Sequence, residues 1–125
     1  MRLRQSLIDA FFYDPIFARC SSEFRSVLDV GSGNGKMMDY FARKNKSVLG
    51  IDLHPTRPDI QKMNFMKNDL RDQSYDLVYS AHLLEHMSDN EAFARELVRV
   101  AKKDVCVMTP LPTNQFWDQP DHIRP

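Results

Sequence analysis

Apolar residues follow two different spacings along this chain, and the two spacings predict strands and helices in alternation. Five short apolar runs have the length of buried strands, the third being the weakest, and they lie at 27–30, 47–51, 63–67, 75–80 and 104–109. Three longer stretches place apolar residues at helical intervals, and they lie at 2–13, 36–45 and 93–101. Strands that alternate with helices over short connections indicate an α/β domain built on a parallel sheet.

Local signals mark where several of these elements begin and end. Asp14 and the proline after it are expected to end the first helix, whose apolar side chains should lie against the domain. Ser88 and Glu91 have the spacing of a capping box and are expected to begin the last helix. Pro55 and Pro58 predict a short, poorly helical connection after the second strand.

The connection between the first strand and the next helix contains three glycines at alternate positions. They are Gly31, Gly33 and Gly35, within the sequence VLDVGSGNGK. Glycine adopts positive φ without strain and lets a ligand approach the backbone where a Cβ atom would block it. The N–H groups at the start of the following helix have no partner inside the helix and point into the same space. A strand, a glycine turn and a helix in this order therefore predict a ligand site.

The spacing around these glycines favours an adenosine-containing ligand over a bare phosphate. A phosphate-binding P-loop needs a glycine where Val30 stands and a hydroxyl residue where Met37 stands. The dinucleotide fingerprint needs a glycine at Lys36. Asp52, however, follows Gly31 by 21 positions and ends the second predicted strand. Dinucleotide-binding folds carry at that place the carboxylate that accepts hydrogen bonds from ribose hydroxyls.

The glycine turn and the residues around it resemble the first motif of the class I S-adenosylmethionine-dependent methyltransferases. Asp29 stands two positions before the first glycine, Tyr75 and Asp76 begin an apolar strand, and a Leu-Glu-His segment ending at His86 follows that strand. The resemblance covers about residues 25–110. It implies an α/β, three-layer Rossmann-like fold with the strand order 3-2-1-4-5, lacking the antiparallel hairpin that usually closes the sheet of this family.

The resemblance also implies roles for particular residues. The amino-acid half of S-adenosylmethionine is expected at the glycine turn, with Asp29 near its amino group, and the methyl group at the end of the fourth strand. The implied cofactor-binding residues are Asp29, Gly31, Ser32, Gly33, Asn34, Gly35, Asp52, Leu53, Asp69, Leu70, Ser80, Ala81 and His82. Among them Asp52 is expected at the ribose, and Asp69 and Leu70 at the adenine. His82, His122 and Asp121 are candidate bases for an acceptor that must lose a proton, and nothing in the sequence identifies that acceptor.

Two other functions compete with methyl transfer. His82, Glu85 and His86 match the H-x-x-E-H signature of certain zinc proteases, in which both histidines share one helical face. A catalytic zinc site usually has a third protein ligand, and the glutamates that follow, Glu91 and Glu96, lie close by on the next predicted helix, so no metal is expected. The second alternative is a module that binds S-adenosylmethionine without transferring its methyl group, as a sensor or a partner subunit.

Composition limits the number of domains and the class of partner. The 125 residues are expected to form one domain, 1–125, with a single core. Lys and Arg number 17, as do Asp and Glu, so the chain lacks the broad basic surface of a nucleic-acid-binding protein. No run approaches the ~18 apolar residues of a membrane span. Cys20 and Cys106 have no metal-site spacing, and two free thiols fit a cytoplasmic protein.

Both ends of the chain are expected to pack against the sheet domain. Residues 1–24 are predicted to form an N-terminal helical segment. Residues 110–125 form a proline-rich tail with Phe116 and Trp117, which is expected to cover the sheet near the ligand. The strand at 104–109 would otherwise be an open edge, and proteins cover or pair such edges. We expect the tail or a second copy of the chain, as in a homodimer, to cover it.

Overall fold

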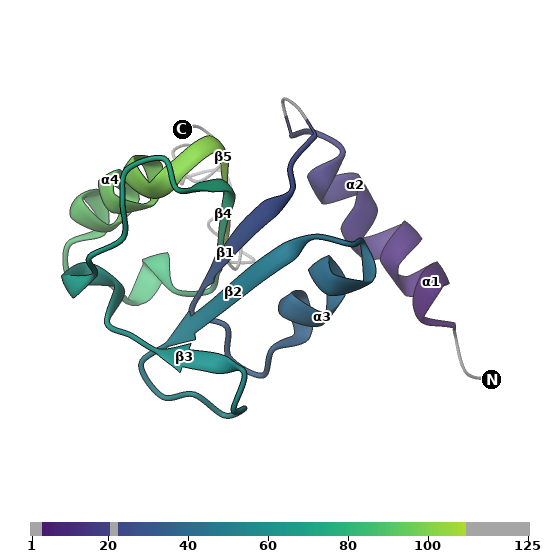
Figure 1. The fold of residues 1–125 in the computed structure, drawn as a ribbon, viewed down its shortest axis with the longest axis horizontal. Helices are drawn as coiled ribbons and strands as arrows, with labels where there is room; N and C mark the ends of the chain where they lie inside the picture. Colours follow the sequence, from purple (N-terminus) through teal and green to yellow (C-terminus); the bar gives the residue numbers. More distant parts are fainter. Residues whose placement is uncertain (1–3, 21–22, 110–125) are drawn as a thin grey trace, which may run out of the picture.

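Five parallel strands form one sheet in the order β3-β2-β1-β4-β5 (Figure 1). The computed structural model describes residues 4–20 and 23–109. The strands are β1 (Ser26–Val30), β2 (Ser47–Asp52), β3 (Ile60–Lys62), β4 (Tyr75–Ala81) and β5 (Ala101–Met108). The predicted parallel sheet and strand order are confirmed. Because the strands run in one direction, the residues that follow β1, β2 and β4 meet at one side of the sheet, called the carboxyl edge below.

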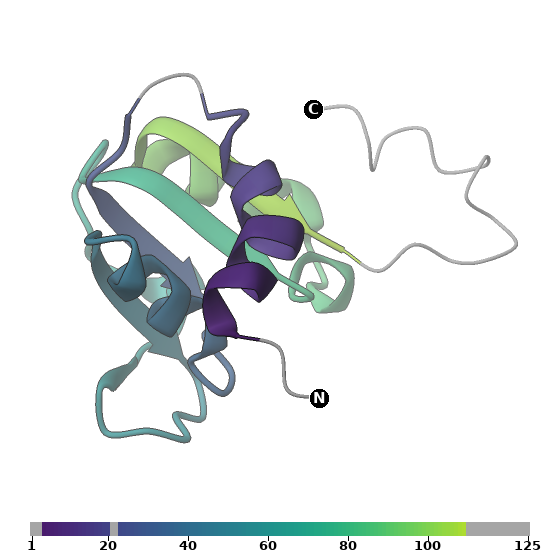
Figure 2. The same cartoon turned by 90° about the vertical axis from the view of Figure 1, so that its right-hand side faces the viewer.

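Helices lie on both faces of the sheet and make three layers (Figures 1 and 2). α3 (Lys36–Arg43) and an N-terminal segment lie on one face, and α4 (Asn90–Val100) lies on the other. The N-terminal segment consists of α1 (Gln5–Ile8), the π-helical turn η1 (Asp9–Tyr13) and α2 (Asp14–Phe17). Two short 3-10 turns follow β3 and β4, and they are η2 (Phe65–Lys67) and η3 (Leu84–His86).

Successive residues of the central strands supply two separate buried cores, because side chains along a strand alternate between its faces. Val27 and Leu77 belong to the core under α3 and the N-terminal segment, whereas Leu28 and Val78 belong to the core under α4. The first core also contains Phe17, Phe24, Tyr40, Phe41 and Tyr79. The second also contains Val30, Ile51, Phe65, Phe93, Leu97 and Val100.

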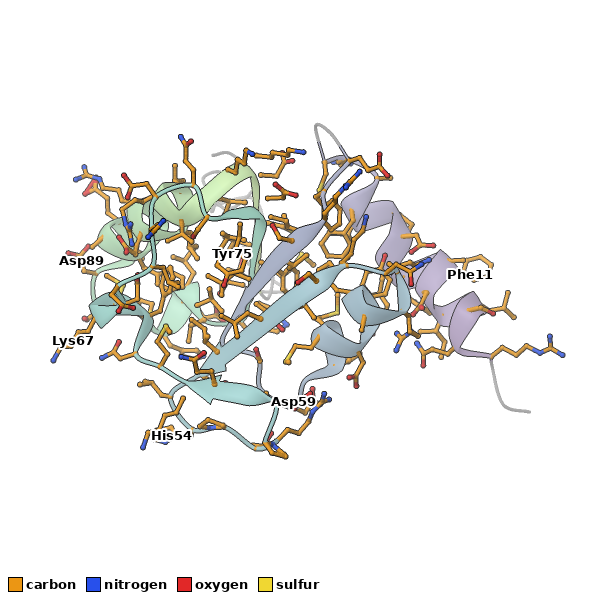
Figure 3. The ribbon with its side chains drawn as sticks, viewed as in Figure 1. Phe11, His54, Asp59, Lys67, Tyr75 and Asp89 are labelled. Carbon is orange, nitrogen blue, oxygen red and sulfur yellow. The ribbon has the colours of Figure 1, made fainter. Side chains whose placement is uncertain are left out.

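The N-terminal helix does not end at Asp14 and Pro15, and its apolar side chains do not all pack inward. The helical backbone continues to Phe17, because a proline in the first turn of a helix gives up an N–H that would have no helical partner. Phe11 and Phe12 are 74% and 63% exposed, and Figure 3 shows Phe11 directed away from the body of the protein. The face that packs on α3 instead contains the buried carboxylate of Asp9, which accepts two hydrogen bonds from the Arg43 guanidinium at 2.9 Å.

The third strand lies earlier in the chain than the run 63–67 predicted. β3 spans Ile60–Lys62 and pairs with the end of β2, while part of the predicted run forms η2. Only Ile60 of β3 is buried, so this strand at the sheet edge lacks the apolar pattern on which the prediction depended. The short connection expected from Pro55 and Pro58 is confirmed, since residues 53–59 join β2 to β3 without a helix.

The last helix and the last strand also differ in detail from the sequence expectation. Asp89, and not Ser88, caps α4, because its side chain accepts a hydrogen bond from the N–H of Ala92 at 3.0 Å. β5 begins at Ala101, earlier than the predicted 104. The tail 110–125, with its expected packing over the sheet, lies outside the described residues. Among the residues that the structure does describe, none of the helices is long and apolar enough to cross a membrane.

Candidate functional site

The three glycines of the turn after β1 all have positive φ, but their surroundings differ. A Cβ on Gly35 would collide with the guanidinium of Arg57, and a Cβ on Gly31 would lie 3.1 Å from Cδ2 of Leu83. A Cβ on Gly33 would meet no atom within 4 Å. A side chain at Gly35 would displace the Arg57 guanidinium and one at Gly31 would press on Leu83, whereas Gly33 borders open space. Gly33 is the position where the backbone is accessible to a ligand.

Nearly every backbone N–H of the turn already has a partner. Gly31 and Ser32 donate to the carbonyl of Ile51, Gly33 donates to Asp52, and Gly35 donates to Ser32. Lys36 donates to the side-chain oxygen of Asn34 at 3.0 Å. Within the described part of the chain, only the N–H of Asn34 has no partner among residues 31–36. This group is an available hydrogen-bond donor beside Gly33.

Asp52 lies at the carboxyl edge with both carboxylate oxygens oriented by the backbone. Oδ2 accepts the N–H of Gly33 and Oδ1 accepts the N–H of His54, each at 2.9 Å. A carboxylate oxygen can accept a second hydrogen bond, so the side chain can still bind hydroxyl groups. The side chain is half-buried, and Leu53 beside it is exposed. The predicted pairing of the glycine turn with Asp52 is therefore present in the structure as a direct contact.

Asp29 is buried under the turn, and its carboxyl group is unusually basic. The pKa of Asp29 is raised to about 7, chiefly by burial; a hydrogen bond from Ser32 lowers it, and the Asp52 carboxylate raises it by a smaller amount. The Ser32 hydroxyl also donates to the Asp29 carbonyl at 2.9 Å. A cationic group placed beside Asp29 would favour the charged form of this carboxyl. The site therefore has a buried acid suited to an ammonium group.

The end of β4 adjoins the turn, but its three predicted residues differ in their access to a ligand. Ser80 is fully buried and donates to the Val30 carbonyl at 3.1 Å, so its side chain lies inside the sheet. Ala81 is half-buried, and His82 is exposed directly after the strand. His82 has a φ of 58°, an uncommon conformation for a residue with a side chain, and its N–H donates to the Met108 carbonyl at 2.7 Å.

Asp69 and Leu70 follow η2 in the connection that leads to β4. The Leu70 carbonyl accepts a hydrogen bond from Arg99 of α4 at 2.8 Å, and the Leu70 side chain packs against the core under α4. Because β3 ends at Lys62, the residues that follow it at the carboxyl edge are Met63 and Asn64. Met63 donates its N–H to the Asp52 carbonyl at 3.0 Å. The sequence did not single out Met63 and Asn64, because it placed the third strand later in the chain.

The H-x-x-E-H motif does not form the helical arrangement of a zinc protease. His82 lies before η3 in a left-handed conformation, so it does not share a helical face with His86. The His86 side chain is 73% exposed. Nowhere in residues 4–20 and 23–109 do three His, Cys, Asp or Glu side chains form a group that could hold a metal ion.

Further residues at the site carry no motif that sequence reasoning could have used. Thr56 donates its hydroxyl to the Gly33 carbonyl at 2.8 Å, and Arg57 and Leu83 occupy the space beside two of the glycines. Pro55 and Pro58 signalled only that this connection was short. His122 and Asp121, proposed as bases from the sequence, lie outside the described residues.

A pocket of about 410 Å³ opens between the N-terminal segment and α3 and meets the glycine turn at Asn34. Two of its charged side chains are already paired, Asp39 with Arg57 and Arg43 with Asp9. The Nζ of Lys36 lies 5.4 Å from the ring centroid of Tyr13 and has no ion pair within the described part of the protein. The pocket therefore offers a cation and an aromatic ring next to the turn. Its remaining lining residues are Gln5 and Ile8.

Comparison with known proteins gives consistent matches over the same region. The sequence family described as "Methyltransferase domain" matches residues 28–108, which include the glycine turn, Asp52 and His82. Ajmaline N-methyltransferase of Rauvolfia serpentina is 33% identical over 116 residues, covering 73% of this chain and 40% of that protein. Ubiquinone biosynthesis O-methyltransferase of Bartonella quintana is 23% identical over 129 residues, covering 92% of this chain and 51% of that protein. The chain thus spans about half the length, or less, of these relatives.

Solved structures show the same fold. A SAM dependent methyltransferase from Archaeoglobus fulgidus matches 88% of this chain and 55% of its own, with a TM-score of 0.61 and 24% sequence identity. At this identity the likeness concerns the arrangement of strands and helices. It agrees with the sheet order and the three layers described above.

Proposed function

Because the chain belongs to the methyltransferase domain family, we propose that it binds S-adenosylmethionine and transfers the methyl group to an acceptor. The observation that carries the proposal is the contact between Gly33, whose Cα borders open space, and the Asp52 carboxylate at the end of the neighbouring strand. The chain spans only part of its relatives, so the activity of the whole protein belongs to the proposal.

The residues present have the donors and acceptors that S-adenosylmethionine requires. The carboxylate of Asp52 would accept the ribose hydroxyls, while its two backbone donors hold it in place. The buried acid Asp29 would face the ammonium group, and the free N–H of Asn34 would donate to the carboxylate group. For the adenine, Leu53 and the residues Asp69 and Leu70 remain in the proposal, and the end of β3 adds Met63 and Asn64.

The remaining cofactor-binding residues of the proposal complete this set. The backbone of Gly31, Ser32, Gly33 and Gly35 would form the surface under the amino-acid half. Ser80, Ala81 and His82 would border the methyl group. The side chain of Ser80 is buried in the sheet, so Ser80 would do so through its backbone. The match of residues 28–108 to the family supports these assignments together.

Bound S-adenosylmethionine would supply a methyl group from its sulfonium. The acceptor atom would bond to the methyl carbon in line with the carbon–sulfur bond as that bond breaks, and S-adenosylhomocysteine would leave. The part of this chain in such a reaction is to align the acceptor atom and exclude water. An acceptor that must lose a proton also needs a base within hydrogen-bond reach. His82, exposed directly after β4, is the proposed base, and His122 and Asp121 remain further candidates from the sequence.

Binding and turnover test the proposal separately. We expect calorimetry to detect binding of S-adenosylmethionine and of S-adenosylhomocysteine, its demethylated product, to the purified chain. Absence of binding would contradict the proposal. Incubation with cofactor labelled in the methyl group and with cell extract should then label an acceptor. Binding without any labelling would favour the alternative, a binding module or partner subunit.

The proposal also includes a homodimer through the edge of β5 and a cytoplasmic location. β5 pairs with β4 on one side, and an edge strand is stabilised when a second strand covers its other side. The free thiols of Cys20 and Cys106 support a reducing compartment. Sedimentation of the chain with and without a charged substitution at Val107 would test the dimer, because a charge on this half-buried edge residue should favour the monomer.

A further inference from the structure

The connection between β2 and β3 replaces a helix with a loop that folds back onto the glycine turn. Parallel strands are usually joined by a crossover of a dozen or more residues that contains a helix. Here residues 53–59 make the connection, and they project beyond the sheet near the start of α3 (Figures 1 and 2). Figure 3 shows His54 and Asp59 on this loop. Its position gives two of its side chains access to the backbone of the turn.

Arg57 is held in a fixed plane by two carboxylates. Its Nη1 and Nη2 atoms donate to the two oxygens of Asp39 on α3, each at 3.0 Å. Its Nε and Nη2 atoms donate to Asp59 at 3.0 and 2.6 Å. In this position Nη1 also donates to the Asn34 carbonyl at 3.3 Å, and the guanidinium occupies the space beside Gly35. The loop is therefore attached to the turn through a rigid, charged group.

Thr56 adds a second attachment that controls the direction of one peptide group. Its hydroxyl donates to the Gly33 carbonyl at 2.8 Å. In a planar trans peptide the N–H points opposite to the carbonyl of the preceding residue. The bond from Thr56 therefore directs the N–H of Asn34 away from the loop, and this N–H is the one donor of the turn without a partner in the described chain.

We propose that Arg57, together with Thr56, is a positioning residue for the amino-acid half of the cofactor. The Thr56 hydroxyl fixes the peptide between Gly33 and Asn34, and thereby aims the N–H of Asn34 at the carboxylate group of the ligand. Arg57 fixes the next peptide through the Asn34 carbonyl, so that Asn34 is held on both sides. The proposal rests on the function proposed above. It assigns to the loop 53–59 the role of holding the turn in its binding conformation. Thr56 and Arg57 perform this role through the backbone of the turn, and neither side chain touches the ligand.

A pair of ligands separates positioning from general destabilisation. S-adenosylhomocysteine contains the amino-acid half, whereas 5′-methylthioadenosine lacks it and keeps the adenosine. Calorimetry would give both dissociation constants for the unmodified chain, for Arg57→Met and for Thr56→Val. Arg95→Met is the matched control, because Arg95 is exposed and, within residues 4–20 and 23–109, forms its ion pair with Glu91 on α4 alone. Thr56→Val removes one hydroxyl at nearly constant volume, so it remains informative if Arg57→Met does not fold.

We expect Arg57→Met and Thr56→Val to weaken S-adenosylhomocysteine about tenfold, as for the loss of one good hydrogen bond, and to leave 5′-methylthioadenosine within about twofold. Arg95→Met should change neither constant. Equal weakening of both ligands, or no weakening, would overturn the positioning role while leaving the proposed function intact. An unmodified chain that binds neither ligand would instead contradict the proposed function.

Discussion

The backbone N–H of Gly33 donates to Oδ2 of Asp52 at 2.9 Å and joins the turn after β1 to the end of β2. The contact connects two features that are 19 residues apart in the chain. It orients the carboxylate before any ligand binds, so that less conformational entropy is lost on binding. The residue that is expected to recognise ribose is therefore part of the same hydrogen-bonded unit as the glycine turn.

Asp52→Asn is expected to reduce the affinity for S-adenosylhomocysteine while the protein stays folded. Hydrogen bonds to a charged group contribute about 1.5–3 kcal/mol, so the dissociation constant should rise about 10- to 150-fold. Calorimetry measures the constant. Glu91→Gln, an exposed change on α4, is the control and should have no effect. An unchanged constant in Asp52→Asn would exclude the ribose-binding role.

Alanine at Gly33 should mainly reduce ligand binding, whereas alanine at Gly35 should mainly reduce stability. Both positions have positive φ, which costs an alanine about 1–2 kcal/mol. At Gly33 the new methyl group meets no protein atom, so the chain should fold but lose S-adenosylhomocysteine binding. At Gly35 the methyl group collides with Arg57, so the midpoint of thermal unfolding should fall further. Scanning calorimetry and titration would measure both effects, and binding by Gly33→Ala at full affinity would refute the ligand position.

The sheet could be predicted from the sequence because its central strands have a strong local pattern. β1 and β4 contain fully buried Val27, Leu28, Leu77 and Val78, and such runs read as strands without tertiary information. β3 could not be placed in this way, since two of its three residues are exposed and its pairing with β2 is the main reason for its structure.

The candidate site was predictable where its residues are linked by spacing, and unpredictable where they are linked by tertiary contacts. Gly33 and Asp52 lie within one strand–turn–helix–strand unit. The length of such a unit is nearly constant, so it sets the spacing between the two residues. Arg57 reaches Asp39 and Asn34 only because the loop folds back, and no sequence pattern encodes that path. The sequence placed an apolar face of the N-terminal segment against the domain and did not predict that Asp9 would be buried there. A buried Asp9 is stable because it pairs with Arg43, which is distant in the sequence.

The buried carboxyl of Asp29 should make the folded chain less stable as the pH rises from about 4 to about 7. The pKa of Asp29 is about 7 in the folded chain, because of burial, and near 3.9 when unfolded. Between these values the folded chain holds a proton that the unfolded chain has released. The free energy of unfolding should therefore fall by up to about 1.4 kcal/mol per pH unit.

Asp29→Asn isolates this contribution, since an amide does not titrate. Urea unfolding of both proteins across the same range should show the variant gaining stability relative to the unmodified chain as the pH rises. The pKa of Asp76 is lowered by backbone hydrogen bonds, and the pKa of Glu96 by Arg99, so both groups act on stability in the opposite direction to Asp29 and are the same in the two proteins. Tyr79 on β4 has a raised pKa and stays neutral there. Parallel curves for the two proteins would show that Asp29 is not buried as described.

Arg43→Met should release the N-terminal segment from α3. The Asp9 side chain is 5% exposed and accepts two hydrogen bonds from Arg43, so the variant leaves a buried carboxylate whose one remaining side-chain donor among the described residues is Gln5. Breaking such a pair costs about 3 kcal/mol when both partners are buried, and we expect about 2 kcal/mol because Arg43 is partly exposed. Hydrogen exchange should accelerate across residues 5–17.

Lys44→Met provides the comparison for that experiment, because Lys44 binds Asp14 in the same segment through an exposed ion pair. Such pairs contribute less than about 1 kcal/mol, and Asp14 keeps the hydroxyl donor of Tyr40. Hydrogen exchange in this variant should stay close to that of the unmodified chain. Adding Asp9→Asn to Arg43→Met should recover part of the stability, since an amide needs no counter-charge. A double variant as unstable as Arg43→Met alone would indicate that the Arg43 side chain acts through packing and not through its charge.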